Sequence, residues 1–178
     1  MSRVAAVVLA AGAATRYGAP KQRLLLPGVL RRVQASPVDE VVVVEGAFPL
    51  GPDEAAEPSR VVSCADWERG PGASLRCGLV ALAEDVDAAV VLLADGPRVS
   101  PDAIARVLRS WREEGGDVVA ASYGGMRGHP LVLARSRWGE VPDEGLRAVT
   151  PRLVPCDDLG EPGDVDTPAD LESLAEDG

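Results

Sequence analysis

A loop rich in glycine and alanine, with two cationic residues, follows the first apolar run of the chain. The run Val4–Leu9 continues directly into AAGAATRYGAPK, which contains Arg16 and Lys21. Small residues let backbone N–H groups approach phosphate oxygens, and two cations offset the charge of a polyphosphate. The loop is neither a P-loop nor a dinucleotide fingerprint, because no Gly-Lys-Ser/Thr ends it and GxGxxG is absent. From the residues alone, phosphate binding and an ordinary surface turn are equally good interpretations.

A second glycine-rich segment, RGPGASLRCGL, follows the apolar run Val61–Ser63. Such an entry leaves the N–H groups at a helix N-terminus free for an anion or a base edge, and Ser74 could cap the helix or bind a ligand. Spacing alone favours the simpler interpretation, which is a capped helix behind a flexible turn.

Carboxylates stand at two places where they could hold a metal ion. Asp95 comes just after the apolar run Ala88–Leu93, and GDVDTPADL near the C-terminus contains Asp164 and Asp166. Two carboxylates within ~4 Å of each other repel by about 4 kcal/mol at an effective dielectric constant of about 20, so a converging pair implies a bound cation. Hard oxygen ligands beside a triphosphate favour Mg²⁺. A turn aspartate is an equally good interpretation of Asp95.

Capping explains the start of the C-terminal helix without any metal. Thr167 is the expected N-cap, Pro168 occupies the first helical position, and Asp170 completes a capping box. Capping requires neither of the acids that precede Thr167, so their presence needs another reason.

These segments follow apolar runs of strand length, and helical patterns fall between most of the runs. The expected strands are Val4–Leu9, Val41–Val44, Val61–Ser63, Ala88–Leu93, Val118–Ala121 and Leu131–Leu133. The expected helices include Ser74–Ala83 and Pro101–Trp111, the latter with Ser100 as its N-cap. The alternation predicts an α/β fold, a three-layer sandwich with a mostly parallel, Rossmann-like sheet, in a single domain spanning residues 1–178. Ligands bind beyond the carboxyl ends of strands in such sheets, so the segments above are expected to share one site.

Composition restricts the partners. The chain has 178 residues and a net charge of −10, which disfavours binding to nucleic acid. The N-terminal apolar run is too short to span a bilayer, so we expect no membrane association. Cys64, Cys77 and Cys156 are odd in number and form no CxxC pair. They therefore predict neither a zinc site nor a disulfide framework, and they favour a reducing compartment, the cytoplasm.

The first loop resembles the signature LAAGxxxRxGxxK of the MobA/MocA-like NTP transferases, which include molybdenum cofactor cytidylyltransferases. LAAG, Arg16, Gly18 and Lys21 carry the match. The resemblance implies a nucleotide-diphospho-sugar transferase type of sheet and a loop that wraps the triphosphate, with Arg16 and Lys21 as catalytic contacts to phosphate. It also assigns nucleotide binding to the residues of the LAAG element, which are Leu9, Ala10, Ala11 and Gly12. The LAAG form implies cytosine, so CTP is the expected donor in preference to GTP.

Three further elements resemble the same family in the same order. The segment from Trp67 is similar to WxxGxxxSLxxGL, which implies nucleotide binding by Gly72, Ser74 and Gly78. The aspartate after the fourth expected strand and the DxDTPxDL element imply a Mg²⁺ site made by Asp95 and Asp166, with Asp164 as a further candidate.

The third element contains the only histidine of the chain, His129, in SYGGMRGHPLVL. A lone histidine is more often a turn or core residue than a ligand. However, GxxGHPxxL is similar to a family element beside the acceptor pocket, so Gly128 and His129 become candidate acceptor contacts. Arg127 and Arg147 could meet a phosphate of the acceptor.

Taken with the family, these segments predict transfer of a nucleoside monophosphate, CMP by preference, from an NTP to a small phosphorylated acceptor such as molybdopterin, with a molybdoenzyme as a further partner. The chain is shorter than its relatives from Gln22 to Val41 and again from Glu140 to Val149. These losses keep three alternatives open. They are a sugar-phosphate or other phosphate-ester nucleotidyltransferase, a non-catalytic nucleotide- or molybdopterin-binding maturation factor, and a protein-interaction domain.

Overall fold

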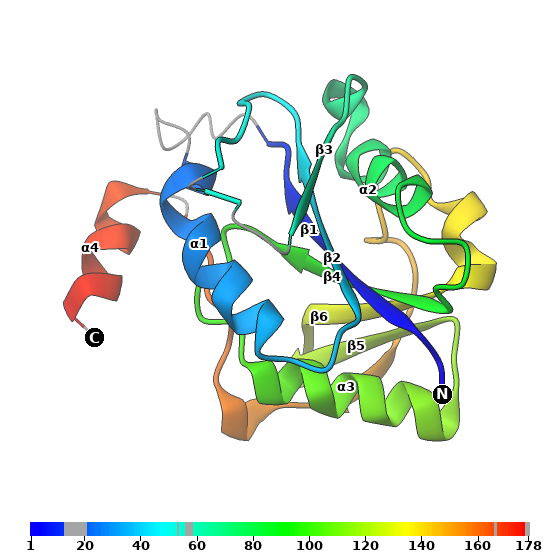
Figure 1. Cartoon of the computed structure of the whole chain (residues 1–178). Helices are drawn as coiled ribbons and strands as arrows, with labels where there is room; N and C mark the ends of the chain where they lie inside the picture. The colour runs from blue at the N-terminus through cyan, green and yellow to red at the C-terminus, as the bar shows by residue number, and fades with distance from the viewer. Residues whose placement is uncertain (13–20, 53, 56–58, 166, 177–178) are drawn as a thin grey trace.

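A computed structural model describes residues 1–12, 21–52, 54–55, 59–165 and 167–176. Within these ranges the chain forms a seven-stranded sheet in the order β3-β2-β1-β4-β6-β5-β7 (Figure 1). The strands are β1 (Val4–Ala10), β2 (Glu40–Glu45), β3 (Arg60–Ser63), β4 (Ala88–Leu93), β5 (Val118–Tyr123), β6 (Met126–Ala134) and β7 (Arg152–Pro155). Strand β6 pairs antiparallel with β4 and β5, and the other pairings are parallel. The predicted mostly parallel sheet is confirmed.

Helices cover both faces of the sheet, as a three-layer sandwich requires (Figure 1). The helical elements are α1 (Lys21–Gln34), η1 (Trp67–Arg69), α2 (Pro71–Val80), α3 (Pro101–Glu114), η2 (Arg135–Glu140), η3 (Asp157–Leu159) and α4 (Pro168–Glu176). Buried residues of α1 and α3 pack in one apolar cluster, and those of α2 pack in another on the opposite face. None of these helices has the length and hydrophobicity of a membrane-spanning segment, a finding that covers the described ranges only.

Strand β1, in the interior of the sheet, is buried on both faces and has small side chains. Val4, Ala6 and Val8 pack toward α1 and α3, whereas Ala5 and Val7 pack toward α2. All five side chains are fully buried. Because successive side chains of a strand point to opposite faces, a nearly continuous apolar run is the pattern expected of a strand covered on both sides.

Capping residues start two helices as their sequences predict. The Ser100 side chain accepts a hydrogen bond from the Ala103 N–H at 3.3 Å at the start of α3. At α4, the Thr167 N–H donates to Asp170 Oδ2 at 2.7 Å and the Asp170 N–H donates to Thr167 Oγ1 at 3.3 Å. This reciprocal pair is the predicted capping box.

Helix α1 has 14 residues. Pro27 lies inside it, beside Gly28, and this pair is more typical of a turn than of a helix interior. However, Leu26, Val29 and Val33 are fully buried in the core. Packing of this apolar face against the sheet outweighs the unfavourable local propensity.

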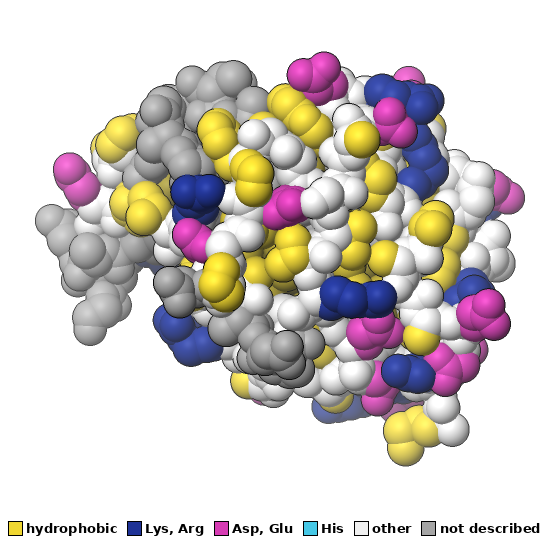
Figure 2. All heavy atoms as spheres, turned by 45° about the horizontal axis from the view of Figure 1, so that its top comes forward, with side chains coloured by type: hydrophobic (Ala, Val, Ile, Leu, Met, Phe, Trp, Pro, Cys, Tyr) yellow, Lys and Arg dark blue, Asp and Glu magenta, His cyan; other side chains and the backbone are white. Residues whose placement is uncertain are grey.

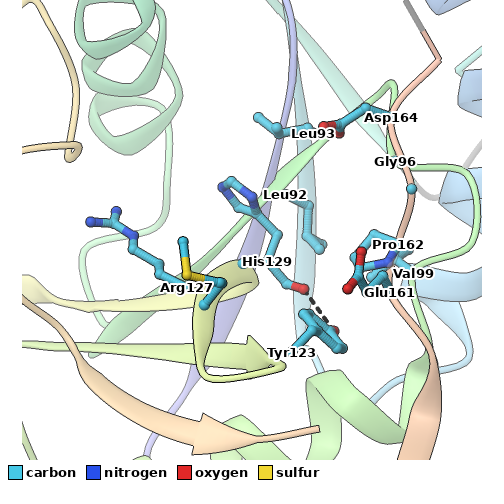
Figure 3. Close-up of a pocket in the computed structure, with 13 residues that line it drawn as sticks. Leu92, Leu93, Gly96, Val99, Tyr123, Arg127, His129, Glu161, Pro162 and Asp164 are labelled. Carbon is cyan, nitrogen blue, oxygen red and sulfur yellow. Dashed lines mark hydrogen bonds between the residues drawn. The ribbon is translucent and has the colours of Figure 1, made fainter. Parts of the chain in front are cut away.

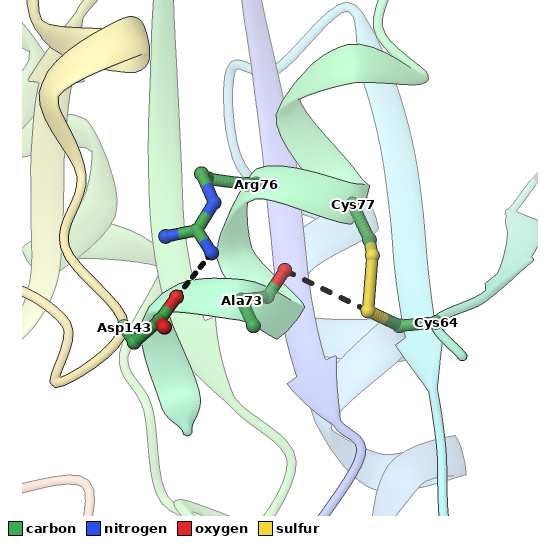
Figure 4. The surroundings of a disulfide bond; sticks show 5 residues. All are labelled: Cys64, Ala73, Arg76, Cys77 and Asp143. Carbon is green, nitrogen blue, oxygen red and sulfur yellow. Dashed lines mark hydrogen bonds and ion pairs between the residues drawn. A yellow bond between two sulfur atoms is a disulfide. The ribbon is translucent and has the colours of Figure 1, made fainter. Parts of the chain in front are cut away.

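The prediction of no disulfide was wrong. Cys64 and Cys77 are joined, with 5.8 Å between their Cα atoms, so that the residue after β3 is tied to α2 (Figure 4). Cys156 is a free, buried cysteine. An odd count and the absence of CxxC spacing carry no information about which two cysteines meet across a strand and a helix, because that distance is set by the packing.

Candidate functional site

Parallel strands β1 and β4 end at the same edge of the sheet, and cavities lie along that edge. Ala94 N–H donates to the Leu9 carbonyl at 3.0 Å, which joins the two strand ends. Figure 2 turns this edge, at the top of Figure 1, toward the viewer and shows hydrophobic side chains gathered in the middle of the face. Small-molecule sites are usually lined by apolar side chains with a few polar groups that orient the ligand. The polar groups at this edge are therefore candidates for ligand binding.

The first cavity, which we call the Ser74 pocket, has a volume of about 330 Å³. Its described lining comes from the end of β1, from η1 and the start of α2, and from the end of β4. The lining residues are Leu9, Ala11, Gly12, Trp67, Glu68, Gly70, Pro71, Ser74, Leu93 and Asp95. Five residues predicted from three separate motifs thus meet at one cavity: Leu9, Ala11, Gly12, Ser74 and Asp95. Ala10 is buried on the opposite face of the sheet, in the cluster that contains α1.

Ser74 presents a polar group to this pocket from inside α2. The helix begins at Pro71 with Gly70 as its N-cap, so Ser74 does not cap it. The residue is only 4% exposed. In the part of the chain that the structure describes, the Ser74 hydroxyl has no hydrogen-bond partner. A buried hydroxyl at the wall of a cavity is suited to bind a polar ligand, because leaving it unpaired is costly.

The N–H groups at the start of α2 are occupied, contrary to the expectation that a ligand would find them free. The Gly72 N–H donates to the Asp143 carbonyl at 2.9 Å, and the N–H groups of Ala73 and Ser74 donate to the Gly70 carbonyl at 3.1 and 3.4 Å. Pro71 has no N–H group. Nucleotide recognition at α2 would therefore use side chains rather than the backbone.

Gly72 and Gly78 are not among the lining residues of the Ser74 pocket, and each has a packing role. A Cβ atom on Gly72 would lie 1.6 Å from the Pro142 carbonyl oxygen, and one on Gly78 would lie 2.6 Å from Val7 Cγ1. Both positions therefore require the absence of a side chain. Gly72 and Gly78 would therefore affect nucleotide binding indirectly, by setting the position of α2.

The predicted metal ligands come from two segments that contact each other. Asp95 follows β4, and the Val165 N–H donates to the Asp95 carbonyl at 3.2 Å. This bond places Val165, and with it the preceding Asp164, at the end of β4. Asp166 lies outside the described residues. Asp164 lines the neighbouring cavity, where its carboxylate points toward Leu93 (Figure 3).

A divalent cation at these carboxylates would take some of its ligands from the protein and others from the nucleotide. Among the described residues there is no group of three or more His, Cys, Asp or Glu arranged to bind a metal. Mg²⁺, however, is usually held by one or two carboxylates together with substrate phosphates and water. Of the described carboxylates, Asp95 lines the Ser74 pocket and Asp164 lines the neighbouring His129 pocket.

The second cavity, which we call the His129 pocket, also has a volume of about 330 Å³ and shares Leu93 with the Ser74 pocket. Gly128 and His129, the predicted acceptor contacts, both line it. They lie within β6 rather than in a turn. The Tyr123 hydroxyl donates to the His129 carbonyl at 2.9 Å (Figure 3), and a Cβ atom on Gly128 would lie 2.9 Å from the Tyr123 ring.

Burial lowers the pKa of His129 to about 4, and the nearby positive charge of Arg127 adds to this effect, whereas Asp95 opposes it. His129 is therefore neutral at pH 7. A neutral imidazole can donate one hydrogen bond and accept another, so it can bind a polar ligand without supplying a charge.

The lowered pKa of His129 predicts a loss of stability in mild acid. Between its ordinary pKa of 6.5 and its folded value of about 4, the unfolded chain binds a proton that the folded chain does not. The free energy of unfolding is thus expected to fall by at most about 2 kcal/mol more in the wild type than in His129→Gln when the pH drops from about 7 to about 5. Urea unfolding of both proteins at the two pH values measures this difference. Equal losses in the two proteins would contradict the prediction.

The structure describes two of the four predicted cationic side chains, those of Arg127 and Arg147. Arg16 and the side chain of Lys21 lie outside the described residues. Arg127 NH1 donates to the Leu146 and Val149 carbonyls at 2.7 and 2.8 Å, so part of its guanidinium is engaged by the protein. Arg147 is exposed and lines a third cavity of about 180 Å³, which shares Leu9 and Leu93 with the Ser74 pocket.

A parallel sheet of this order with its site at the carboxyl ends of β1 and β4 defines an α/β domain of the nucleotide-diphospho-sugar transferase type. The same fold is found in CMP:2-keto-3-deoxy-manno-octonic acid synthetase solved with CTP, with a TM-score of 0.78 over 98% of both chains at 14% identity. The chain belongs to the family of MobA-like NTP transferase domains, whose sequence profile matches residues 6–153. The predicted family and fold class are confirmed.

Comparison with individual proteins agrees with this assignment. The chain is 33% identical over 129 residues to 2-C-methyl-D-erythritol 4-phosphate cytidylyltransferase from Rubrobacter xylanophilus, a match that covers 66% of the chain and about half, 54%, of that relative. The crystal structure of Rv0371c from Mycobacterium tuberculosis is 26% identical, with a TM-score of 0.79 and coverage of 98% of each chain. Rv0371c has also been solved in complex with manganese. That structure has a TM-score of 0.78 at 24% identity and covers 99% of this chain and 100% of its own.

Proposed function

We propose that the protein transfers a nucleoside monophosphate from an NTP to a small phosphorylated acceptor and releases pyrophosphate. The observation that carries this proposal is the Ser74 pocket, where the end of β1, Ser74 of α2 and Asp95 meet in a domain of the MobA-like NTP transferase family. The His129 pocket adjoins it through Leu93 and offers room for an acceptor. Two adjoining pockets at one sheet edge suit a reaction between two bound substrates.

The reaction would be an in-line displacement at the α-phosphorus of the NTP. A phosphate oxygen of the acceptor forms the new P–O bond, and the bond to the β-phosphate breaks as pyrophosphate leaves. A phosphorylated acceptor brings its own anionic nucleophile, so no general base is needed. The neutral His129 fits this scheme as a binding group for the acceptor, together with Gly128.

Charge compensation would come from cations around the triphosphate. Family resemblance assigns Arg16 and Lys21 to the phosphates, although the structure does not describe either side chain. Asp95 and Asp166, with Asp164 nearby, would hold a divalent cation, proposed to be Mg²⁺. When bound, this cation would offset the charge that develops on the phosphate oxygens. Manganese in the Rv0371c complex supports a divalent ion for a protein of this fold.

We propose CTP as the donor and a molybdopterin-like phosphate ester as the acceptor. The LAAG form of the first loop supports cytosine, and so does the similarity to a cytidylyltransferase of Rubrobacter xylanophilus. A molybdoenzyme would then receive the product. The cytoplasm, which contains CTP and Mg²⁺, is the compartment in which this reaction would run.

A ligand panel tests the proposed function directly. CTP, GTP, ATP and UTP are each added with Mg²⁺ at one common concentration, about 100 times the Kd of the favoured nucleotide, which is expected to raise the Tm by about 5 °C or more. CTP is expected to give the largest shift, and chelation of the metal is expected to abolish it. Pyrophosphate release is then measured with molybdopterin and with sugar phosphates as acceptors. A Tm unchanged by every nucleotide would reject the proposal, and binding without pyrophosphate release from any acceptor would favour a non-catalytic maturation factor.

A further inference from the structure

A short loop connects the nucleotide side of the site to the acceptor side. Residues 141–149, which we call the strap, run between η2 and β7 and lie against the start of α2. Strap residues Glu144, Gly145, Leu146 and Arg147 line the third cavity together with Pro71 of α2 and His129 of β6. The strap thus lines a third cavity, which shares Pro71 with the Ser74 pocket and His129 with the His129 pocket.

The strap is bonded to the start of α2 by both its backbone and its side chains. The Asp143 carbonyl accepts from the Gly72 N–H at 2.9 Å. The Asp143 carboxylate accepts from Arg69 of η1 at 3.0 Å. It also accepts from Arg76 of α2 (Figure 4), so the two arginines flank the glycine-rich turn. Arg76 also donates to the Val141 carbonyl at 2.6 Å. A single aspartate therefore holds both ends of the segment that lines the Ser74 pocket.

The contact between strap and turn leaves no space for adjustment. A Cβ atom on Gly70 would lie 2.3 Å from the Asp143 carbonyl oxygen, and one on Gly72 would lie 1.6 Å from the Pro142 carbonyl oxygen. The two backbones touch, so a shift of the strap must move the turn. The two arginines lower the pKa of the Asp143 carboxyl, Arg76 more than Arg69, so the aspartate is charged at neutral pH.

The far end of the strap is fixed to the acceptor side. Arg127 of β6 donates to the Leu146 and Val149 carbonyls at 2.7 and 2.8 Å. Its neighbour His129 lines the acceptor cavity. Bonds at both ends give the strap a defined position relative to the sheet, which a free loop would lack.

We propose that Asp143 is a positioning residue for nucleotide binding, which holds the turn Gly70–Ser74 in place through the strap. This inference rests on the proposed function, since it concerns the nucleotide pocket. Asp143 does not line that pocket but is bonded to the turn that does. Exposed ion pairs contribute little to global stability, and the Asp143 side chain is 36% exposed. The effect of Asp143 is therefore expected in substrate binding more than in folding.

The test compares Asp143→Ala with a matched control, Asp158→Ala. Asp158 also pairs with an arginine, Arg106, at 2.6 Å, but this pair joins η3 to α3 away from the substrate pockets. The KM for CTP is expected to rise about tenfold or more in Asp143→Ala with kcat changed by less than about twofold, because charge-assisted hydrogen bonds that orient the turn are lost. Asp158→Ala is expected to keep both constants. Asp143→Asn, which retains one acceptor oxygen, is expected to recover part of the affinity.

A second measurement separates this proposal from the proposed function. Amide hydrogen exchange in the peptide covering residues 67–75, without nucleotide, is expected to be faster in Asp143→Ala than in the wild type and unchanged in Asp158→Ala. If the wild type binds no nucleotide, the proposed function fails, and the exchange result still decides whether Asp143 holds the turn Gly70–Ser74 in place. If Asp143→Ala does not fold, Arg69→Ala removes one of the two ion pairs and gives the same comparison. Exchange and KM equal to those of the control would overturn the role of Asp143.

Discussion

Asp95→Asn is expected to reduce nucleotidyl transfer by about a thousandfold or more while the fold is retained. Asparagine has the same shape, but it removes the negative charge that would hold a divalent cation at the end of β4. Loss of a charged metal ligand costs several kcal/mol of transition-state stabilisation, and each 1.4 kcal/mol corresponds to about tenfold in rate. Pyrophosphate release with saturating CTP, acceptor and Mg²⁺ measures the effect. A higher concentration of metal is expected to recover part of the rate.

Asp87→Asn is the matched control for this experiment. Asp87 precedes the same strand at its opposite end, where its carboxylate accepts from the Arg3 N–H at 2.9 Å. Transfer by Asp87→Asn is expected to equal that of the wild type. Transfer by Asp95→Asn within about tenfold of the wild-type rate would exclude Asp95 from metal binding, because a lost ligand has a larger effect.

Gly72→Ala is expected to lower the free energy of unfolding by about 2–3 kcal/mol, as overpacking of a well-packed site does, and to weaken nucleotide binding as well. The new methyl group would lie 1.6 Å from the Pro142 carbonyl oxygen, and this atom belongs to the backbone and cannot rotate away. The start of α2 and the strap must therefore separate, which breaks the bond from the Gly72 N–H to the Asp143 carbonyl. Urea unfolding and the CTP-induced shift in Tm measure the two effects.

Gly78→Ala provides the comparison. Its methyl group would meet the side chains of Val7 and Val44 at 2.6 and 2.8 Å, so α2 must shift away from the sheet. A loss of stability of about 1–3 kcal/mol is expected, but Gly78→Ala is expected to lose less affinity for CTP than Gly72→Ala, because the bond from the Gly72 N–H to the strap stays intact. Equal losses of affinity in Gly72→Ala and Gly78→Ala would mean that the bond between Gly72 and the strap has no separate role in nucleotide binding.

The predicted site depended on which segments meet at one edge of the sheet, and several of the described residues do line one cavity there; their roles in binding and catalysis stay predictions. Leu9 lies near the end of β1 and Asp95 follows β4, and these parallel strands end together. Ser74, in the helix after β3, lines the same cavity. Which backbone groups remain free at that cavity did not follow from the motif. The N–H group of Gly72 is bonded to Asp143, a residue from a distant part of the chain that resembled no functional motif.

The amino-acid sequence by itself predicted six of the seven strands, two of the helix starts and the family, but it did not predict β7. Apolar runs, β-branched residues and helix caps such as Ser100 depend on residues only a few positions apart. Strands and helix starts can therefore be predicted from neighbouring residues in the chain. Only the tertiary structure decided that α1 continues through Pro27, that Cys64 joins Cys77, and that the strap clamps the start of α2. Each of these depends on a distance between segments far apart in sequence, and such distances exist only after the sheet order and the packing of both faces are established.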